Sequence, residues 1–387
     1  MSIFSKFRFK WFISTRSIQY SIDFFERVYK IYLNHNKVVH WRDGYPVYSL
    51  STPAVYSKPA VNLFSRSVFS TIQNRNFPNL MSFAVNDTCN VNCEHCSFFE
   101  SADDRSRQIL TLDQSKKLIE DAQELGVSVI NIVGGEPLLR DDLPEIVSSI
   151  DKDLSIAILF TNGWFLEEKA EQLKQSGLDG VYISMDSANR EEHDKRRRKD
   201  GLFDKALAGI QAAKKAGLTV GLSCTISEDD FRSGRLKAII ELGQELGVHE
   251  VLVFDMVPVG RAKSRDDLID NRAWIEEMIT FSKKYNKDKS YPGVLIYAYA
   301  TSYRSTGCSG GTSYFYASPY GDISPCDFNH AGFGNILQKP LYKIWDELST
   351  HPHFSQATWQ GCKMKDSEFL NASDKKQSGC SGCSCEH

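Results

Sequence analysis

The chain has 387 residues, enough for one large domain with appended segments, and its 41% hydrophobic and 25% charged residues are ordinary for a globular protein. Its net charge of −3 gives no whole-protein case for nucleic-acid binding, and no apolar run is long enough to span a bilayer. Without a signal-peptide pattern the expected location is the cytoplasm, where ten cysteines argue for metal binding or redox chemistry rather than for disulfides.

Residues 1–75 form a predicted N-terminal extension that is rich in aromatic and basic side chains. Residues 1–41 carry seven Lys/Arg against two Asp/Glu, with eleven aromatic residues among them. Such a segment could lie at a membrane surface as a basic amphipathic helix. It could equally pack against the rest of the protein, or dock a substrate or a partner. A turn-rich stretch at 44–59 connects it to the following core.

From about residue 80 to 260, short apolar runs alternate with amphipathic segments of helical periodicity. Near-continuous runs of Val and Ile are typical of strands buried on both faces of a parallel sheet. The six runs are 80–86, 128–135, 155–162, 180–186, 219–227 and 250–258. Helices are predicted between them from the apolar stripes at 203–213 and 236–246 and from a capping box of Thr111 with Gln114. Six such units suit either an open doubly wound sheet or a partial (β/α)6 barrel.

Polar or glycine-rich residues follow each predicted strand. A cysteine motif follows the first, the sequence GGEP at 134–137 follows the second, and TNG at 161–163 follows the third. The fourth ends in Ser184-Met185-Asp186, and the sixth runs into 257–262. Taken singly, each could be a turn or a helix cap. Because parallel strands deliver their carboxyl ends to one rim, the set together indicates a composite site.

The cysteine motif consists of Cys89, Cys93 and Cys96, spaced C-x3-C-x2-C. A structural zinc site usually has four protein ligands, and His95 is too constrained between two of the cysteines to complete a tetrahedron comfortably. An iron–sulfur cluster has thiolates as its natural ligands and tolerates a different ligand at one iron. An iron–sulfur cluster is therefore preferred over zinc.

With this motif after the first strand and six β–α units, the sequence resembles the radical S-adenosylmethionine (AdoMet) superfamily, whose fold is a partial (β/α)6 TIM-type barrel. The resemblance implies that Cys89, Cys93 and Cys96 hold three irons of a [4Fe–4S] cluster, with AdoMet on the fourth. It also assigns AdoMet contacts to further residues. These are Gly134, Gly135, Glu136 and Pro137 of GGEP, with Glu136 receiving the amino group, and Asn162, Ser184 and Arg197, the last pairing with the carboxylate. The adjacent Arg196 and Arg198 are alternatives to Arg197, because the motif fits with a shift of one residue.

The reaction implied by this resemblance is reductive cleavage of AdoMet to a 5′-deoxyadenosyl radical that takes a hydrogen atom from a substrate. The electron would come from a partner such as flavodoxin or ferredoxin. The substrate would be a peptide, a protein or a small molecule. A lipid-linked small molecule would suit an N-terminal segment that lies at a membrane surface. An iron–sulfur electron carrier or sensor without AdoMet chemistry is the alternative function, although it would not need GGEP or Arg197 at the rim.

The C-terminal region holds a second group of cysteines. Cys308, Gly321 and Cys326, spaced C-x12-G-x4-C, resemble the SPASM/twitch extension that binds auxiliary iron–sulfur clusters, with a hairpin turn at 319–322. One auxiliary [4Fe–4S] cluster is expected. The further ligands implied are Cys362, Cys380 and Cys383, with Cys385 nearby, while a zinc knot and an unliganded tail remain alternatives.

The sequence therefore predicts an α/β protein with three parts. An N-terminal helical extension covers 1–75, a radical AdoMet partial barrel covers 76–285, and a small β-hairpin and helix domain that binds the auxiliary cluster covers 286–387.

Overall fold

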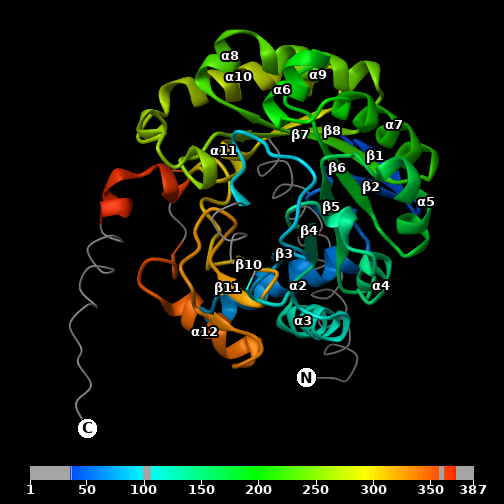
Figure 1. The fold of residues 1–387 in the computed structure, drawn as a ribbon. Helices are drawn as coiled ribbons and strands as arrows, with labels where there is room; N and C mark the ends of the chain where they lie inside the picture. The colour runs from blue at the N-terminus through cyan, green and yellow to red at the C-terminus, as the bar shows by residue number, and fades with distance from the viewer. Residues whose placement is uncertain (1–34, 36, 99–105, 357–360, 372–387) are drawn as a thin grey trace, which may run out of the picture.

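The computed structural model describes residues 35, 37–98, 106–356 and 361–371 (Figure 1). Residues 1–34, which hold most of the aromatic and basic N-terminal segment, lie outside the described residues, as do Cys380, Cys383 and Cys385. None of the helices in the described ranges is both long and apolar enough to cross a membrane.

A ten-stranded sheet forms the framework of the molecule. Its strands are β3 (Leu80–Ala84), β4 (Val129–Val133), β5 (Ile156–Thr161), β6 (Gly180–Ser184), β7 (Thr219–Ile226), β8 (Glu250–Asp255), β9 (Gly293–Ile296), β10 (Tyr314–Ala317), β11 (Asp322–Ser324) and β12 (Gly334–Asn335). The order is β12-β11-β10-β3-β4-β5-β6-β7-β8-β9, so β9 and β12 are the two edges and the barrel is open. Every pair from β10 to β9 is parallel, whereas β11 and β12 are antiparallel.

The six predicted strands are β3 to β8, which confirms the partial barrel. Two strands were not predicted to join it. β9 is only four residues long and follows Pro292, so it gives a weak pattern. β10 was expected only as part of the C-terminal hairpin, and it does pair with β11 across a turn at 318–321. It also pairs in parallel with β3, with Phe315 opposite Met81. One continuous sheet thus crosses the predicted boundary at 285, which stays a prediction.

Helices cover the outside of the sheet (Figure 1). They are α3 (Leu112–Leu125), α4 (Leu143–Ser148), α5 (Leu166–Gln175), α6 (Arg190–Arg197), α7 (Leu202–Lys215), α8 (Glu228–Arg232), α9 (Arg235–Glu245), α10 (Ala273–Lys287) and α12 (Leu341–Thr350). The short α11 (Tyr297–Ala300) instead follows β9 at the mouth of the barrel. The predicted capping box at α3 is present: Thr111 N donates to Gln114 Oε1 at 2.9 Å, and Gln114 N donates to Thr111 Oγ1 at 3.3 Å. The predicted stripes are the buried faces of α7 and α9.

Alternation along the strands divides the apolar residues between two cores. Met81, Phe83 and Ile132 belong to the large core between the sheet and the helices. Ile158, Tyr182 and similar inward-facing residues belong to a smaller core inside the barrel. Both faces are buried, which explains the near-continuous apolar runs in the sequence.

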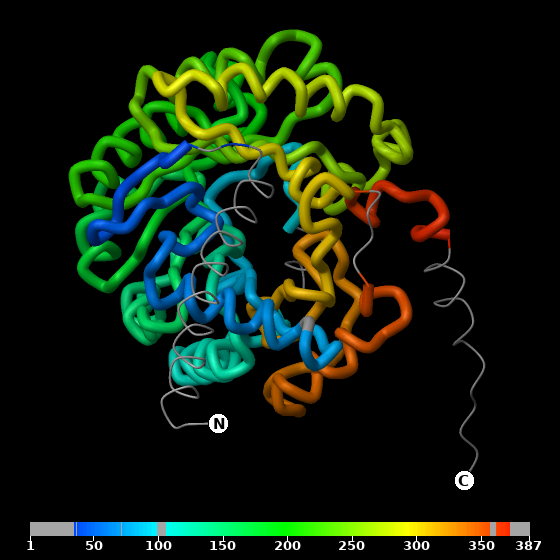
Figure 2. The backbone as a smooth tube through the Cα atoms, turned by 180° about the vertical axis from the view of Figure 1, so that it is seen from behind, coloured from blue at the N-terminus to red at the C-terminus, as the bar shows by residue number. Residues whose placement is uncertain are grey.

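The described part of the N-terminal extension closes the end of the barrel at which the strands begin. It comprises the hairpin β1 (His40–Arg42) and β2 (Tyr45–Val47) and the helix α2 (Lys58–Gln73). Between them Leu50 inserts into the inner core. Seen from behind in Figure 2, these blue segments lie across the back of the barrel. The opposite end, where the strands finish, is left for the polar loops.

Candidate functional site

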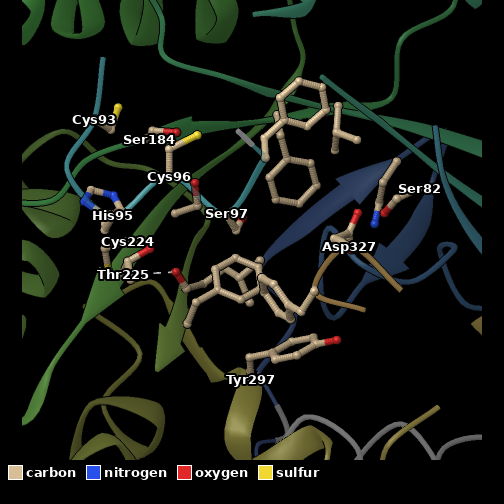
Figure 3. Close-up of a pocket in the computed structure, with 18 of the residues that line it drawn as sticks. Ser82, Cys93, His95, Cys96, Ser97, Ser184, Cys224, Thr225, Tyr297 and Asp327 are labelled. Carbon is tan, nitrogen blue, oxygen red and sulfur yellow. Dashed lines mark hydrogen bonds between the residues drawn. The ribbon is translucent and has the colours of Figure 1, made fainter. Parts of the chain in front are cut away.

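Cys89, Cys93 and Cys96 lie on the loop after β3, and all three line one cavity of about 310 Å³. Figure 3 shows Cys93 and Cys96 at this cavity. The loop after β8 fixes their backbone. Arg261 donates from Nη1 to Cys93 O at 2.6 Å and from its N–H to Cys96 O at 3.0 Å. A Cβ on Gly260, whose φ is +57°, would lie 2.2 Å from Cys96 O. Glycine is therefore needed for this close approach.

The GGEP loop after β4 packs backbone to backbone against the start of the cysteine loop. Gly135 N donates to Asn86 O at 3.2 Å, and Glu136 N donates to Thr88 O at 2.7 Å. A Cβ on Gly135 would lie 2.1 Å from Thr88 O, a distance that side chains do not adopt. The two glycines thus let this loop pass directly beneath the residue that precedes the first cysteine.

Glu136 is buried, and its carboxylate accepts hydrogen bonds from the end of β5 and from the turn that follows it in the sequence. Thr161 Oγ1 donates to Oε1 at 2.6 Å, Leu138 N donates to Oε1 at 3.0 Å, and Asn162 N donates to Oε2 at 2.8 Å. Burial raises the pKa of this carboxyl, and these hydrogen bonds oppose the increase. Glu136 therefore joins the ends of β4 and β5, a positioning role that the sequence could not reveal.

The other predicted cofactor residues lie in the same place, with one exception. Gly134, Asn162 and Ser184 line the cavity with the cysteines. Asn162 Nδ2 donates to Asn90 Oδ1 at 2.8 Å and so connects the end of β5 to the cysteine loop. Pro137 is buried in a short turn that begins there, and it does not line the cavity. Its role is to shape the loop.

Arg197 is buried at the end of α6 and faces the cysteines. Its Nε donates to Asp186 Oδ2 at 2.8 Å, and its Nη1 lies 3.7 Å from Cys93 Sγ. His95 Nε2 lies 3.2 Å from the same Asp186 oxygen. Burial alone would raise the pKa of Asp186, but Arg197 and His95 outweigh it and hold that pKa well below its usual range. A carboxylate thus fixes the one arginine that lines the cavity among the described residues.

The three adjacent arginines, which the sequence could not distinguish, have different surroundings. Arg196 pairs with Asp230 at 3.2 Å, and Arg198 ends α6 in a left-handed conformation with φ of 51°. Only Arg197 reaches the cavity. The sequence did not identify Asp186 as a residue of the site, because an aspartate at the end of a strand is also common as a helix cap.

The three described C-terminal thiols, Cys308, Cys326 and Cys362, lie near one another and near Tyr297, and none of them lines the cavity. Burial raises the pKa of Cys326, and the neighbouring thiols of Cys308 and Cys362 raise it further. Burial raises the pKa of the Tyr297 hydroxyl, and the same three thiols raise it further. Tyr297 lines the cavity. Cys362 thus lies with the two cysteines that flank the β10–β11 hairpin.

A buried ion pair joins the C-terminal segment to the barrel. Lys365, in the turn after Cys362, donates to Asp255 Oδ2 at the end of β8 at 2.9 Å, and both side chains are at most 4% exposed. This pair fixes the position of Cys362 relative to the strands that carry the cavity.

Aromatic side chains separate the two groups of cysteines. The rings of Phe254 and Tyr297 lie 5.0 Å apart, and each lies 6.5 Å from Phe328. Asp327 also faces the cavity and accepts a hydrogen bond from Tyr314. Figure 3 shows Tyr297 and Asp327 across the cavity from Cys93 and Cys96.

The donor set fits an iron–sulfur cluster. Burial raises the pKa of Cys89 to about 12 and also raises that of Cys93, against which Arg197 acts. A bound metal ion would favour the thiolate form of both residues. Within the described residues, no three His, Cys, Asp or Glu side chains converge as the ligands of a single metal ion would. Three thiols and the guanidinium of Arg197 around one cavity suit a cluster whose open iron carries an anionic ligand.

Comparison with known families gives two matches. Residues 84–227 match the Radical SAM superfamily, and residues 308–384 match SPASM, an iron–sulfur cluster-binding domain. Among curated proteins, the AdoMet-dependent heme synthase of Methanosarcina barkeri is 31% identical over 293 residues, which are 70% of this chain and 83% of the relative. The Fe-coproporphyrin III synthase of the same organism is 29% identical over 67% of this chain and 72% of the relative.

Solved structures share the fold. SuiB of Streptococcus suis bound to S-adenosylmethionine aligns with a TM-score of 0.59 and 15% identity, over 76% of this chain and 71% of SuiB. The protein anSMEcpe with bound AdoMet aligns with a TM-score of 0.56 and 16% identity, over 77% of this chain and 95% of the other. At such identities the likeness concerns the fold alone.

Proposed function

Because the chain belongs to the radical SAM superfamily and ends in an iron–sulfur-binding SPASM domain, we propose that it reductively cleaves AdoMet and abstracts a hydrogen atom from a substrate. The observation that carries this proposal is the convergence of Cys89, Cys93, Cys96, the glycines of GGEP and Arg197 on one cavity. An electron carrier would need the cysteines alone. A reducing protein such as flavodoxin or ferredoxin is the proposed electron donor.

A [4Fe–4S] cluster with AdoMet at its open iron supplies one-electron reduction and hydrogen-atom abstraction. Arg197 is proposed to orient the carboxylate of AdoMet, because Asp186 already holds its guanidinium beside Cys93. The loop at Gly134 and Glu136 is proposed to receive the amine, since both residues line the cavity beside the cysteines. Ser184 and Asn162 remain for polar parts of the nucleoside. The aromatic walls exclude water from the reacting groups.

We propose one auxiliary cluster held by Cys308, Cys326 and Cys362. The basis is electrostatic: beyond the effect of burial, Cys308 raises the pKa of Cys326 and of Cys362, and all three thiols raise that of Tyr297, so they lie close together at one place next to the cavity. The fourth ligand would come from Cys380 or Cys383, within 372–387, outside the described residues.

The substrate is proposed to be a peptide or a small molecule that brings a neutral or cationic group into the cavity. The acidic carboxyls near the aromatic wall are those of Asp255, which is paired with Lys365, and Asp327, which accepts a hydrogen bond from Tyr314. Of the described lining residues, only Arg197 and His95 are basic, and both face Asp186. A polycarboxylate would find little to pair with there, although relatives are named for heme and coproporphyrin synthesis.

Anaerobic reconstitution with iron and sulfide, followed by AdoMet and dithionite, tests the proposal. The protein should release 5′-deoxyadenosine, and Cys96→Ala should release none. Cys362→Ala should lose about four irons per chain, while Cys224→Ser, a cysteine not proposed as a ligand, should keep the full iron content. Equal release by Cys96→Ala would refute AdoMet cleavage at this site. Unchanged iron in Cys362→Ala would refute only the auxiliary ligand set.

A further inference from the structure

Exposed apolar side chains are concentrated in the described part of the N-terminal extension. Of ten large hydrophobic side chains that are exposed among the described residues, seven lie between residues 41 and 72. They are Trp41, Tyr45, Tyr56, Val61, Val68, Phe69 and Ile72, with Ile72 73% and Trp41 62% exposed. Single exposed hydrophobic residues are normal, but a cluster of them marks an interaction surface.

These residues lie at one end of the molecule, where the strands begin. Arg42, next to Trp41, donates to Thr219 Oγ1 at the start of β7 at 2.9 Å. Asn62, next to Val61, donates to Leu154 O just before β5 at 3.0 Å. The hairpin and α2 therefore both cover the amino-terminal end of the barrel, as Figure 2 shows from behind.

On α2 the exposed residues form a helical stripe. Val61, Val68 and Ile72 are spaced seven and four residues apart, which places them on one face, with Phe69 beside them. No Asp or Glu occurs from residue 44 to 86. The helix itself therefore contributes no negative charge, and the exposed carboxylate of Asp153 beside it is paired with Lys58 of α2.

A basic cavity lies at the same end of the barrel. It measures about 960 Å³, and its lining includes Lys37, Lys283, Lys287 and Lys289 but no Asp or Glu among the described residues. His35 and His249 also line it, but burial lowers the pKa of each to about 4, so the positive charge comes from the lysines. Asp288, between Lys287 and Lys289, is the acidic residue next to them. His249 stacks edge-on against His40, the residue before Trp41, with ring centroids 4.4 Å apart. The exposed lysines at the end of α10 thus lie beside the aromatic hairpin. Residues 1–34 of the same chain, which lead into this region, add six Lys/Arg against two Asp/Glu.

We propose that the amino-terminal end of the barrel is a docking surface for an anionic lipid bilayer. Trp, Tyr and Phe side chains favour the boundary between headgroups and acyl chains. Lysines close to that boundary attract anionic headgroups by roughly 1 kcal/mol each. A neutral protein partner would use the apolar stripe but would gain nothing from the lysine cavity.

The proposal has a consequence for the substrate. The cysteines lie beyond the carboxyl ends of the strands, and β8 alone extends over six residues, roughly 20 Å, between the two ends. A bilayer at the amino-terminal end would leave the reactive rim facing away from the lipid. The docked enzyme would therefore receive its substrate from the aqueous side, which argues against the lipid-linked substrate considered from sequence.

Co-sedimentation of the full-length, cluster-loaded protein tests the proposal, with vesicles of phosphatidylcholine alone or mixed with phosphatidylglycerol. We expect binding to the mixed vesicles that weakens in high salt. The double variant Phe69→Ser/Ile72→Ser should bind at least tenfold more weakly. Lys287→Gln/Lys289→Gln should lose about fivefold for each lysine, and this loss should vanish in high salt.

Leu337→Ser/Tyr342→Ser is the matched control, because these side chains are 55% and 52% exposed outside the N-terminal extension. It should bind as the unaltered protein does. Equal binding by all variants, or no binding to either vesicle, overturns the proposal. Concentration-dependent dimerisation that Phe69→Ser/Ile72→Ser abolishes, without vesicle binding, would assign the surface to a second copy instead. Iron content and 5′-deoxyadenosine release verify that each variant is intact.

Discussion

Glu250 offers a sharp test of how the N-terminal extension is held in the barrel. The residue begins β8 and is fully buried. Its Oε2 accepts hydrogen bonds from Tyr182 Oη at 2.6 Å, Leu50 N at 2.9 Å and Ser49 Oγ at 3.0 Å. Its Oε1 has no hydrogen-bond partner in the described structure. Burial raises the pKa of this carboxyl from 4.5 to about 7, and the hydrogen bonds only partly oppose the increase.

The sign and size of the effect follow from this pKa. Because the folded-state pKa is raised, the stability that the Glu250 proton contributes is complete below pH 4.5 and is lost as the pH rises through about 7. One pKa unit corresponds to about 1.4 kcal/mol, so the full loss is about 3 kcal/mol, most of it between pH 5 and pH 8. Glu250→Gln stays neutral and keeps an acceptor oxygen, so the variant should avoid this loss.

Thermal unfolding of the two proteins, measured in parallel from pH 5 to pH 8, tests the reasoning. An unfolding entropy of about 0.8 kcal/mol per kelvin for 387 residues converts the change into about 3 °C. The Tm of Glu250→Gln minus that of the unaltered protein should grow by this amount as the pH rises. Glu245→Gln, at the exposed end of α9, should show no such trend. A pH-independent difference for Glu250→Gln would refute the buried, proton-dependent carboxyl.

Two further predictions concern the site. Gly135→Ala should reduce cluster iron and 5′-deoxyadenosine release at least tenfold, because the added Cβ would lie 2.1 Å from Thr88 O. Gly332→Ala, whose added Cβ would have no atom within 4 Å, should match the unaltered protein. Equal iron content in the two variants would contradict the close backbone packing at Gly135. Lys365→Met should cost about 3–5 kcal/mol by leaving Asp255 buried without its partner. Adding Asp255→Asn should recover much of the lost Tm, and no recovery would mean that the charge pair is not the cause.

The sequence predicted those parts of the fold that depend on long, continuous patterns. Runs buried on both faces identified β3 to β8, and their order placed the polar loops at one rim. β9 was not predicted, because four residues that follow a proline are too few to form a recognisable apolar run. The pairing of β10 with β3 escaped because the two strands are separated by more than 200 residues, and no local signal encodes such a contact.

The residues of the site likewise fall into those that the sequence predicted and those that it did not. The cysteines and glycines could be predicted because their spacing carries the chemistry. The roles of Asp186 and Glu136 could not, because each depends on which donors surround a buried carboxylate. Asp186 meets the side chains of Arg197 and His95, while Glu136 accepts from the Thr161 hydroxyl and two backbone N–H groups. The choice among three consecutive arginines likewise required the end of α6, where only Arg197 turns inward.

The pairing of β10 with β3 bears on how the two cysteine groups cooperate. Cys89 follows β3, and Cys308 and Cys326 flank the hairpin that β10 begins, so one parallel ladder joins the two sites. The ion pair of Asp255 with Lys365 adds a second connection, from β8 to the segment of Cys362. Moving either group of thiols relative to the other would break ladder hydrogen bonds or leave a buried charge unpaired. The described C-terminal cysteines are therefore tied to the barrel by this ladder and this ion pair, and the sheet itself sets their distance from Cys89, Cys93 and Cys96.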